Sequence, residues 1–288
     1  MRWSSGGIGP AGPDLDFGYG RADALAAIQS LAPVLYASVL PGSRSVRVGT
    51  TATAFTTIIN AGTAPAVGCG IAPITGVPAI FLYQTTAPAT NQPSGAANTP
   101  ANIAVGGFQT YLVAFTPTAP FSPTEVQLSF SCANAPAATI IAGVNTLLLS
   151  ASAGPVPDVV ALAATLGGDG IVNIPGAGGT GIFAVATVNV GATSTIAVSV
   201  DSGSVGSVVL PATILMCQTV PATGVCQNPP SASVTVTIAA GATPTFGIFV
   251  SGSGMIVPFD PANNRIFVRF KDGGGATRGA TSVAVRTQ

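Results

Sequence analysis

The chain of 288 residues contains no histidine. This absence excludes a Ser-His-Asp or Cys-His catalytic set and the common His-ligated zinc site. The four cysteines do not replace the missing histidines, because Cys69 and Cys132 are too far apart in sequence for a zinc knuckle. Cys217 and Cys226 are close together but have no second pair nearby. We therefore expect no catalytic, metal-binding or cofactor-binding residue, and we expect that this chain is not an enzyme.

Charged residues are also scarce. Nine basic and nine acidic residues make up 6% of the chain and give no net charge, against roughly 25% charged residues in an average domain. Nucleic-acid binding relies on clusters of Lys and Arg that neutralise phosphates, so we expect no nucleic-acid partner. Lysine and glutamate, which favour helices, occur once each, as Lys271 and Glu125. A protein built from long helices or coiled coils is therefore excluded.

What the sequence does contain is typical of a β-protein. Hydrophobic residues make up 48% of it, together with 36 glycines and 24 prolines. Short runs of β-branched and aromatic residues, separated by turn residues, lie at 45–48, 53–59, 79–83, 111–115 and 126–130. This spacing predicts an all-β sandwich. Four aromatic residues lie in or next to these runs and are expected in the core: Tyr83, Phe108, Tyr111 and Phe115.

The sequence also repeats itself. Residues 46–53 parallel residues 188–195, residues 78–90 parallel residues 211–223, and Phe130 parallels Phe270. Two copies in the same order predict two tandem immunoglobulin-like β-sandwich domains, at residues 32–154 and 181–288. Residues 155–180 are rich in glycine and proline and are expected to form a linker. In the competing interpretation, residues 159–166 supply a strand to one of the domains.

One window raises the question of a membrane span. Residues 137–154 are uncharged over 18 positions, at the lower limit for a spanning helix. Pro136 and Pro155 flank the window, and its counterpart in the second copy carries Arg286. We therefore expect a final strand and no transmembrane segment. No apolar segment typical of a secretory signal peptide follows Met1.

Two further patterns resemble ligand-binding loops but are better explained as turns. Gly176, Gly178 and Gly181 match a dinucleotide-binding motif, yet a β pattern and no helix follows them. Asp169 and Asp260 each lie in a glycine-rich or asparagine-rich stretch that has a single carboxylate. A calcium site needs several oxygen ligands, so we expect ordinary turns at both aspartates.

The cysteines allow two interpretations. Their even number, with one pair in each copy of the repeat, is consistent with disulfides Cys69–Cys132 and Cys217–Cys226 formed in an oxidising compartment. Alternatively, all four are buried free thiols, as is common in cytosolic proteins. The low charge and the abundance of Thr and Ser favour the disulfides.

Residues 5–30 resemble the closing segment of a subtilisin-like serine peptidase (subtilase) domain, whose pattern is D-x-x-x-G-Y-G-R-x-[DN]-A-x-x-A-V. The matching residues are Asp14, Gly18, Tyr19, Gly20, Arg21, Asp23, Ala24, Ala27 and Ile28. The resemblance implies that residues 1–31 are a short helical remnant of that α/β peptidase domain, with the helix at residues 22–31. The family's nucleophile motif G-T-S-x-A-x-P and its catalytic Asp and His segments are absent, so no catalytic residue carries over.

These observations lead to two functional hypotheses. In the first, which the resemblance implies, the chain is the non-catalytic C-terminal region of a secreted subtilisin-like serine peptidase. Its β-sandwiches then act as spacers, or bind a protein substrate or a cell-surface component. In the second, it is a structural or adhesin-like cell-surface protein that self-associates, because Glu125 is the only charged residue between positions 48 and 157. Both hypotheses place the chain outside the cell or on its surface.

Overall fold

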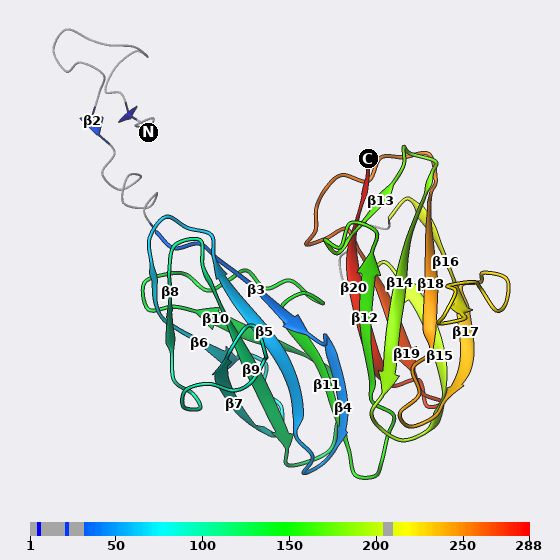
Figure 1. Cartoon of the computed structure of the whole chain (residues 1–288), viewed down its shortest axis with the longest axis horizontal. Coiled ribbons are helices and arrows are strands. Elements are labelled where there is room, and N and C mark those ends of the chain that lie inside the picture. The colour runs from blue at the N-terminus through cyan, green and yellow to red at the C-terminus, as the bar shows by residue number, and fades with distance from the viewer. Residues whose placement is uncertain (1–4, 7–20, 23–31, 204–209) are drawn as a thin grey trace, which may run out of the picture.

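The computed structural model describes residues 5–6, 21–22, 32–203 and 210–288. Within these ranges every regular element is a β-strand and none is a helix (Figure 1). No helix suited to crossing a membrane is found among them. The expected helix at residues 22–31 lies outside the described residues except for Ala22, which belongs to a two-residue strand, β2 (Arg21–Ala22), paired with β1 (Ser5–Gly6). A helical remnant is therefore not part of the described fold.

Residues 32–152, called here the first unit, form two sheets. The four-stranded sheet has the order β3 (Leu35–Leu40), β5 (Ala52–Asn60), β9 (Phe108–Pro117) and β7 (Ala79–Thr86). The five-stranded sheet has the order β4 (Ser43–Arg47), β11 (Thr146–Ser152), β10 (Phe121–Ser131), β6 (Ala66–Pro73) and β8 (Ala101–Ile103). The window that raised the membrane question thus contains β11, a final strand as expected.

Residues 158–288, called here the second unit, repeat this arrangement. Its four-stranded sheet has the order β12 (Val159–Thr165), β14 (Thr180–Asn189), β18 (Thr245–Gly252) and β16 (Ala212–Thr219). Its five-stranded sheet has the order β13 (Ile171–Ile174), β20 (Thr277–Thr287), β19 (Arg265–Lys271), β15 (Ser194–Asp201) and β17 (Ser233–Ile238). Adding nine to each strand number of the first unit reproduces the strand order of the second, so the repeat seen in the sequence is also a repeat of topology.

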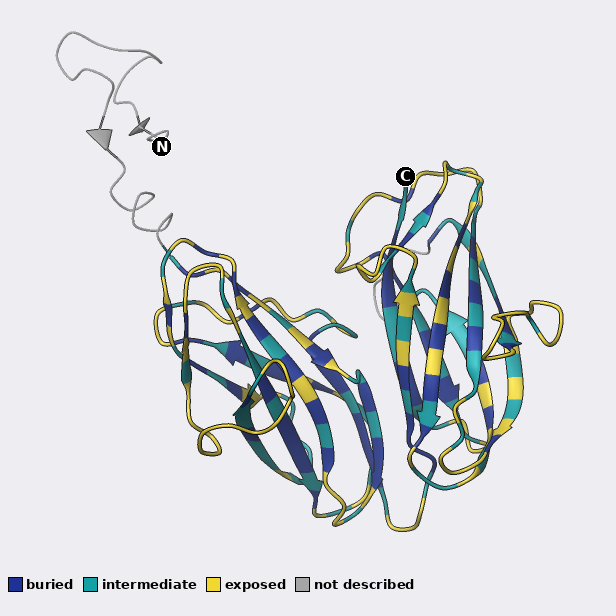
Figure 2. Cartoon of the chain, viewed as in Figure 1, coloured by how far each residue is buried: buried dark blue, intermediate teal, exposed yellow. Residues whose placement is uncertain are grey.

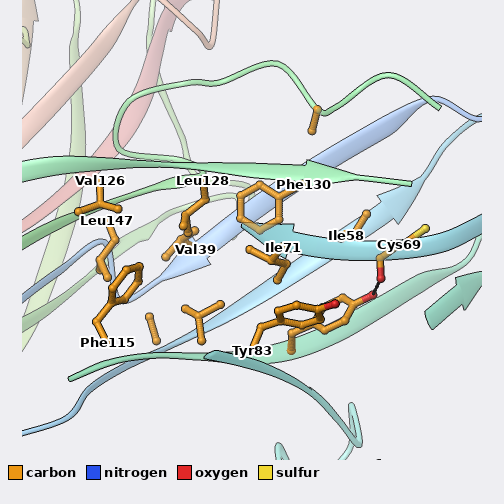
Figure 3. Packing of buried hydrophobic residues seen from close by; sticks show 14 of the residues in the cluster. Val39, Ile58, Cys69, Ile71, Tyr83, Phe115, Val126, Leu128, Phe130 and Leu147 are labelled. Atoms are coloured by element: carbon orange, nitrogen blue, oxygen red, sulfur yellow. Dashed lines mark hydrogen bonds between the residues drawn. The ribbon is translucent and has the colours of Figure 1, made fainter. Parts of the chain in front are cut away.

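Each unit has its own hydrophobic core between its two sheets. Strands such as β5 and β14 alternate buried and exposed residues along their length (Figure 2), because successive side chains of a strand point to opposite faces. In the first core Phe115 lies near Leu147 and Val126 (Figure 3). The hydroxyl of Tyr111 donates to the backbone carbonyl of Cys69 at 3.2 Å. In the second core the rings of Phe246 and Phe270 meet edge to face.

Three of the four aromatic residues expected in the core are buried: Tyr83, Tyr111 and Phe115. The expectation for Phe108 was wrong, because this residue is 55% exposed. It begins β9 at an outward position, opposite Ile59 of β5. A strand pattern predicts alternation but does not determine which of its two faces is covered.

The expected linker also needs correction. Residues 155–180 contain β12, which pairs with β14, and β13, which pairs with β20. The competing interpretation, in which residues 159–166 supply a strand, is the correct one. The motif at Gly176, Gly178 and Gly181 covers the turn between β13 and β14 and the start of β14, where no helix follows.

The first block of the sequence repeat was misaligned. Residues 46–53 cover the end of β4 and the start of β5, whereas residues 188–195 cover the end of β14 and the start of β15. By topology β5 corresponds to β14, so Asn60 corresponds to Asn189. Both asparagines are fully buried. Each accepts a hydrogen bond from the amide of the glycine two residues later, Gly62 or Gly191, at 3.1 Å.

Candidate functional site

No group of three or more His, Cys, Asp or Glu side chains that could hold a metal ion occurs in the described part of the chain. The carboxylates of the two glycine-rich or asparagine-rich stretches make local hydrogen bonds. Asp169 accepts from the backbone amide of Ile171 at 3.0 Å, and Asp260 accepts from the side-chain amide of Asn263 at 2.8 Å. Both aspartates therefore have the local turn contacts expected from the sequence. The remaining candidates for a functional site are the faces of the sheets and the contact between the two units.

The charged residues are distributed unevenly between the sheets. Beyond residue 32, none of the strands of the two four-stranded sheets contains Asp, Glu, Lys or Arg. The charges lie instead in the five-stranded sheets and in the loops, where three ion pairs form: Arg44–Asp158, Arg269–Asp201 and Arg278–Asp272. Each unit thus exposes one sheet face without any charge.

Polar side chains of both units meet at the junction between them. Strand β4 of the first unit lies against β12 and β20 of the second. The ion pair Arg44–Asp158 crosses this junction, with 2.9 Å between the guanidinium Nη2 and the carboxylate Oδ2. Only 14% of the Arg44 side chain and 5% of the Asp158 side chain are exposed. An ion pair this well covered is screened much less by salt than a surface pair.

Asp158 is held from both units. Its second carboxylate oxygen, Oδ1, accepts a hydrogen bond from the backbone amide of Ser45 at 2.9 Å. Its own backbone amide donates to the side-chain oxygen of Asn189 at 3.1 Å. Burial raises the pKa of Asp158 above its ordinary value, although the Arg44 guanidinium and the Ser45 amide act in the opposite direction. Asp158 therefore connects the two units: its carboxylate contacts β4 of the first, and its backbone amide is bonded to the end of β14 in the second.

Small hydroxyl side chains line the first unit's side of the junction. Ser43 of β4 accepts a 2.6 Å hydrogen bond from the backbone amide of Ala280 and donates one back to its carbonyl. Ser45 and Ser150, on the neighbouring strands β4 and β11, are 2.8 Å apart through their hydroxyl oxygens. All three serines are buried. Their small size allows the backbone of β20 to approach the outer face of the first unit's five-stranded sheet closely.

A second contact crosses the junction at Gly143. The hydroxyl of Ser282 donates to the Gly143 carbonyl at 2.9 Å and accepts from the Arg265 guanidinium at 2.7 Å. Gly143 has a φ of +73°, and a Cβ there would lie 2.6 Å from the ring of Phe267. This position therefore requires glycine. Burial lowers the pKa of Arg265 to about 10.

A shallow pocket of about 440 Å³ opens beside this junction. Its walls come from the start of β10, the end of β11 and the β19–β20 turn, and Arg278 lies among the lining residues. The Arg278 guanidinium is already paired with Asp272 at 2.6 Å. This pairing neutralises the only charged side chain of the pocket, which therefore has little to attract a charged ligand.

The four cysteines form two disulfides in the structure, Cys69–Cys132 and Cys217–Cys226. The first joins β6 to the end of β10 within the five-stranded sheet of the first unit. The second joins β16 to the loop that follows it in the second unit. The pairing is the one expected from the sequence, and it places one disulfide in each unit.

Sequence reasoning missed the junction. Its members are separated by up to 237 positions, as in the Ser43–Ala280 contact. Serines near turns resemble solvent-exposed residues, so Ser43, Ser45 and Ser150 gave no signal of burial. One available signal was the placement of the charges at the two ends of the nearly uncharged stretch, where Arg44 and Arg47 precede it and Asp158 follows it.

The segment that carries the subtilase resemblance lies outside the described residues, apart from residues 5–6 and 21–22. No protein-family model matches the sequence, and no curated protein matches it. Among solved structures, the chain is similar to the secreted serine protease VesC from Vibrio cholerae, with 11% identity and a TM-score of 0.25 over 81% of this chain and 49% of VesC. The chain thus spans about half the length of VesC.

Two further solved structures are similar to the chain. A protein of unknown function from Porphyromonas gingivalis has 10% identity and a TM-score of 0.27, over 88% of this chain and 99% of that protein. BcpA, the major pilin subunit of Bacillus cereus, has 8% identity and a TM-score of 0.27, over 88% of this chain and 69% of the pilin. With TM-scores this low, none of the three likenesses carries an argument about function.

Proposed function

We propose that this chain is a non-catalytic, rigid two-domain spacer of an exported protein. Each unit corresponds in this proposal to one immunoglobulin-like domain, with its own core and its own disulfide. The observation that carries the proposal is the buried junction, in which Asp158 is bonded to both units at once. A flexible linker would let the two units move independently, whereas a buried polar junction holds them at a fixed angle.

The subtilase resemblance of residues 5–30 supports a more specific version of this proposal. The chain would then be the C-terminal region of a secreted subtilisin-like serine peptidase, and the two units would hold the catalytic domain at a set distance from a surface or a protein substrate. Disulfides persist in oxidising compartments, so the pairs Cys69–Cys132 and Cys217–Cys226 support a location outside the cell or at its surface.

The purified chain tests the non-catalytic part of the proposal. We expect no hydrolysis of casein or of peptide esters, and no labelling by a fluorophosphonate probe, because the chain has no histidine to activate a serine. A subtilisin-type peptidase at the same concentration serves as the positive control. Covalent labelling of any serine of this chain would contradict the proposal.

A second candidate function is favoured by the uncharged sheet faces. In this alternative the chain is a structural or adhesin-like protein of the cell surface that associates with other copies of itself. Native proteins usually place charges on exposed sheets and edges to prevent such association, and the strands of the two four-stranded sheets carry none.

A further inference from the structure

The outward side chains of β3, β5, β9 and β7 form a surface that we call the first outer face. The strand pairing aligns them in rows that run across the sheet. One row contains Tyr36, Ile59 and Phe108. A second contains Leu40, Phe55 and Leu112. Between these two large apolar rows lies a row of small hydroxyl side chains, namely Ser38, Thr57 and Thr110, while Thr86 at the β7 end of this row is buried.

The apolar rows are open to solvent. Tyr36 is 59% exposed, Phe108 is 55% exposed and Leu40 is 54% exposed. Four strands spaced by about 4.8 Å and eight residues long make a face of about 19 Å by about 27 Å, or about 500 Å² in projection. The two apolar rows occupy part of this area, with the hydroxyl row between them, and large exposed apolar side chains gathered on one face mark interaction sites more often than scattered single residues do.

We propose that the first outer face packs against the same face of a second copy of this chain, forming a two-fold symmetric dimer. The inference rests on the second candidate function and specifies its surface and its partner. A two-fold interface brings one patch against itself, so it must be self-complementary. The alternation of large and small rows meets this condition, because the ridge of Tyr36, Ile59 and Phe108 in one copy fits the threonine groove of the other.

The absence of charge favours a second copy over other occupants. A charged partner would find no opposite charge on these strands, whereas two copies of an uncharged face meet without repulsion between like charges. Sheets that pack face to face lie about 10 Å apart with their strands about 30° from parallel. The first outer faces of two copies can pack in this geometry. A face of about 500 Å² is smaller than the roughly 800 Å² per partner of standard interfaces, so the dimer should be reversible.

Sedimentation equilibrium of the full chain tests the proposal, between about 5 µM and about 1 mM, the range of weak interfaces. We expect the average mass to rise from 28.1 kDa toward twice that value. Ile59→Lys and Phe55→Lys each place a charge in one apolar row and should keep the chain at the monomer mass. Leu166→Lys is the matched control, because Leu166 is 87% exposed in the turn after β12, away from this face. It should dimerise as the unsubstituted chain does.

The outcomes separate the proposed interface from self-association in general. Sodium sulfate should strengthen the dimer, as expected for an apolar interface. A chain that stays monomeric over the whole range would overturn both the interface and the self-associating function. Association that persists in both lysine variants would overturn this interface alone and leave self-association through another surface. Thermal unfolding of each variant verifies folding, and Phe55→Lys keeps the test valid if Ile59→Lys does not fold.

Discussion

Asp158 shows how a single side chain defines the relation between the two units. By topology Asp158 corresponds to Val34 of the first unit. The backbone carbonyl of Asp158 accepts a hydrogen bond from Val190, just after β14, and that of Val34 accepts one from Ala61, just after β5. Val34 is exposed, whereas Asp158 is buried against β4. The same topological position is thus exposed to solvent in the first unit and buried at the junction in the second.

The raised pKa of Asp158 gives a prediction about pH. Because burial holds this pKa above the ordinary value of 3.8, the folded protein favours the protonated form more than the unfolded chain does. The contribution of this group to the free energy of unfolding is therefore largest below pH 3.8 and is lost as the pH rises through the raised pKa. The variant Asp158→Asn, which is neutral at every pH, serves as the reference.

The measurement is urea unfolding of both proteins across this pH range. The stability of the unsubstituted chain minus that of Asp158→Asn should decrease as the pH rises from below 3.8 toward neutrality. The effects of the other carboxylates cancel in this difference. A difference that grows with pH would mean that the attraction to Arg44 outweighs the cost of burial.

At the scale of elements, the two disulfides differ in the length of chain that they enclose. Cys69 and Cys132 are 63 positions apart, and Cys217 and Cys226 are 9 apart. In the chain-entropy model the longer loop contributes about 4 kcal/mol to stability and the shorter one about 2.5 kcal/mol. The longer crosslink should therefore matter more to its unit.

We expect the double variant Cys69→Ser/Cys132→Ser to lose more melting temperature than Cys217→Ser/Cys226→Ser. Both variants remove a complete pair, so that neither leaves an unpaired thiol. Differential scanning calorimetry of the secreted protein is the measurement, and titration of free thiols in the unsubstituted chain is its control. Equal losses, or a larger loss for the second pair, would contradict the expectation. Four free thiols would refute the pairing itself.

The sequence predicted the strands better than it predicted their partners. The runs that became β5, β7, β9 and β10 were recognisable because alternating or clustered β-branched and aromatic residues mark half-buried strands. The linker prediction failed because Pro155, Pro157 and a group of glycines border β12 and β13 and obscure them. The alignment of the two sequence copies did not pair Asn60 with Asn189. The feature that these residues share is a buried side chain that closes a turn, and not a run of similar residues.

The candidate site was less predictable than the fold. A disulfide pairing can be proposed from the number and spacing of cysteines, and both pairs are present in the structure. The junction depends instead on serines and on one Arg–Asp pair brought together from positions more than a hundred residues apart. Nothing in the local sequence distinguishes such serines from those of an exposed loop, because the residues that they contact are distant in the sequence.

At the scale of the whole molecule, two kinds of surface have separate roles in this account. The five-stranded sheets and the loops carry the charges, and β4, β12 and β20 meet at the polar junction within the chain. The four-stranded sheets are uncharged, and the first of them is the proposed contact between chains. A rigid junction would give both outer faces a fixed orientation, which a spacer and a self-associating surface protein both require.

The central claim is that the junction makes the two units one rigid body, and residual dipolar couplings of backbone amides test it most directly. In weakly aligned, isotope-labelled protein, a single alignment tensor should fit the couplings of both units. In the variant Ala280→Arg, which inserts a large side chain where β20 meets Ser43, the two units should need different tensors. Two clearly different tensors in the unsubstituted chain would show that the units move independently, and would contradict the claim.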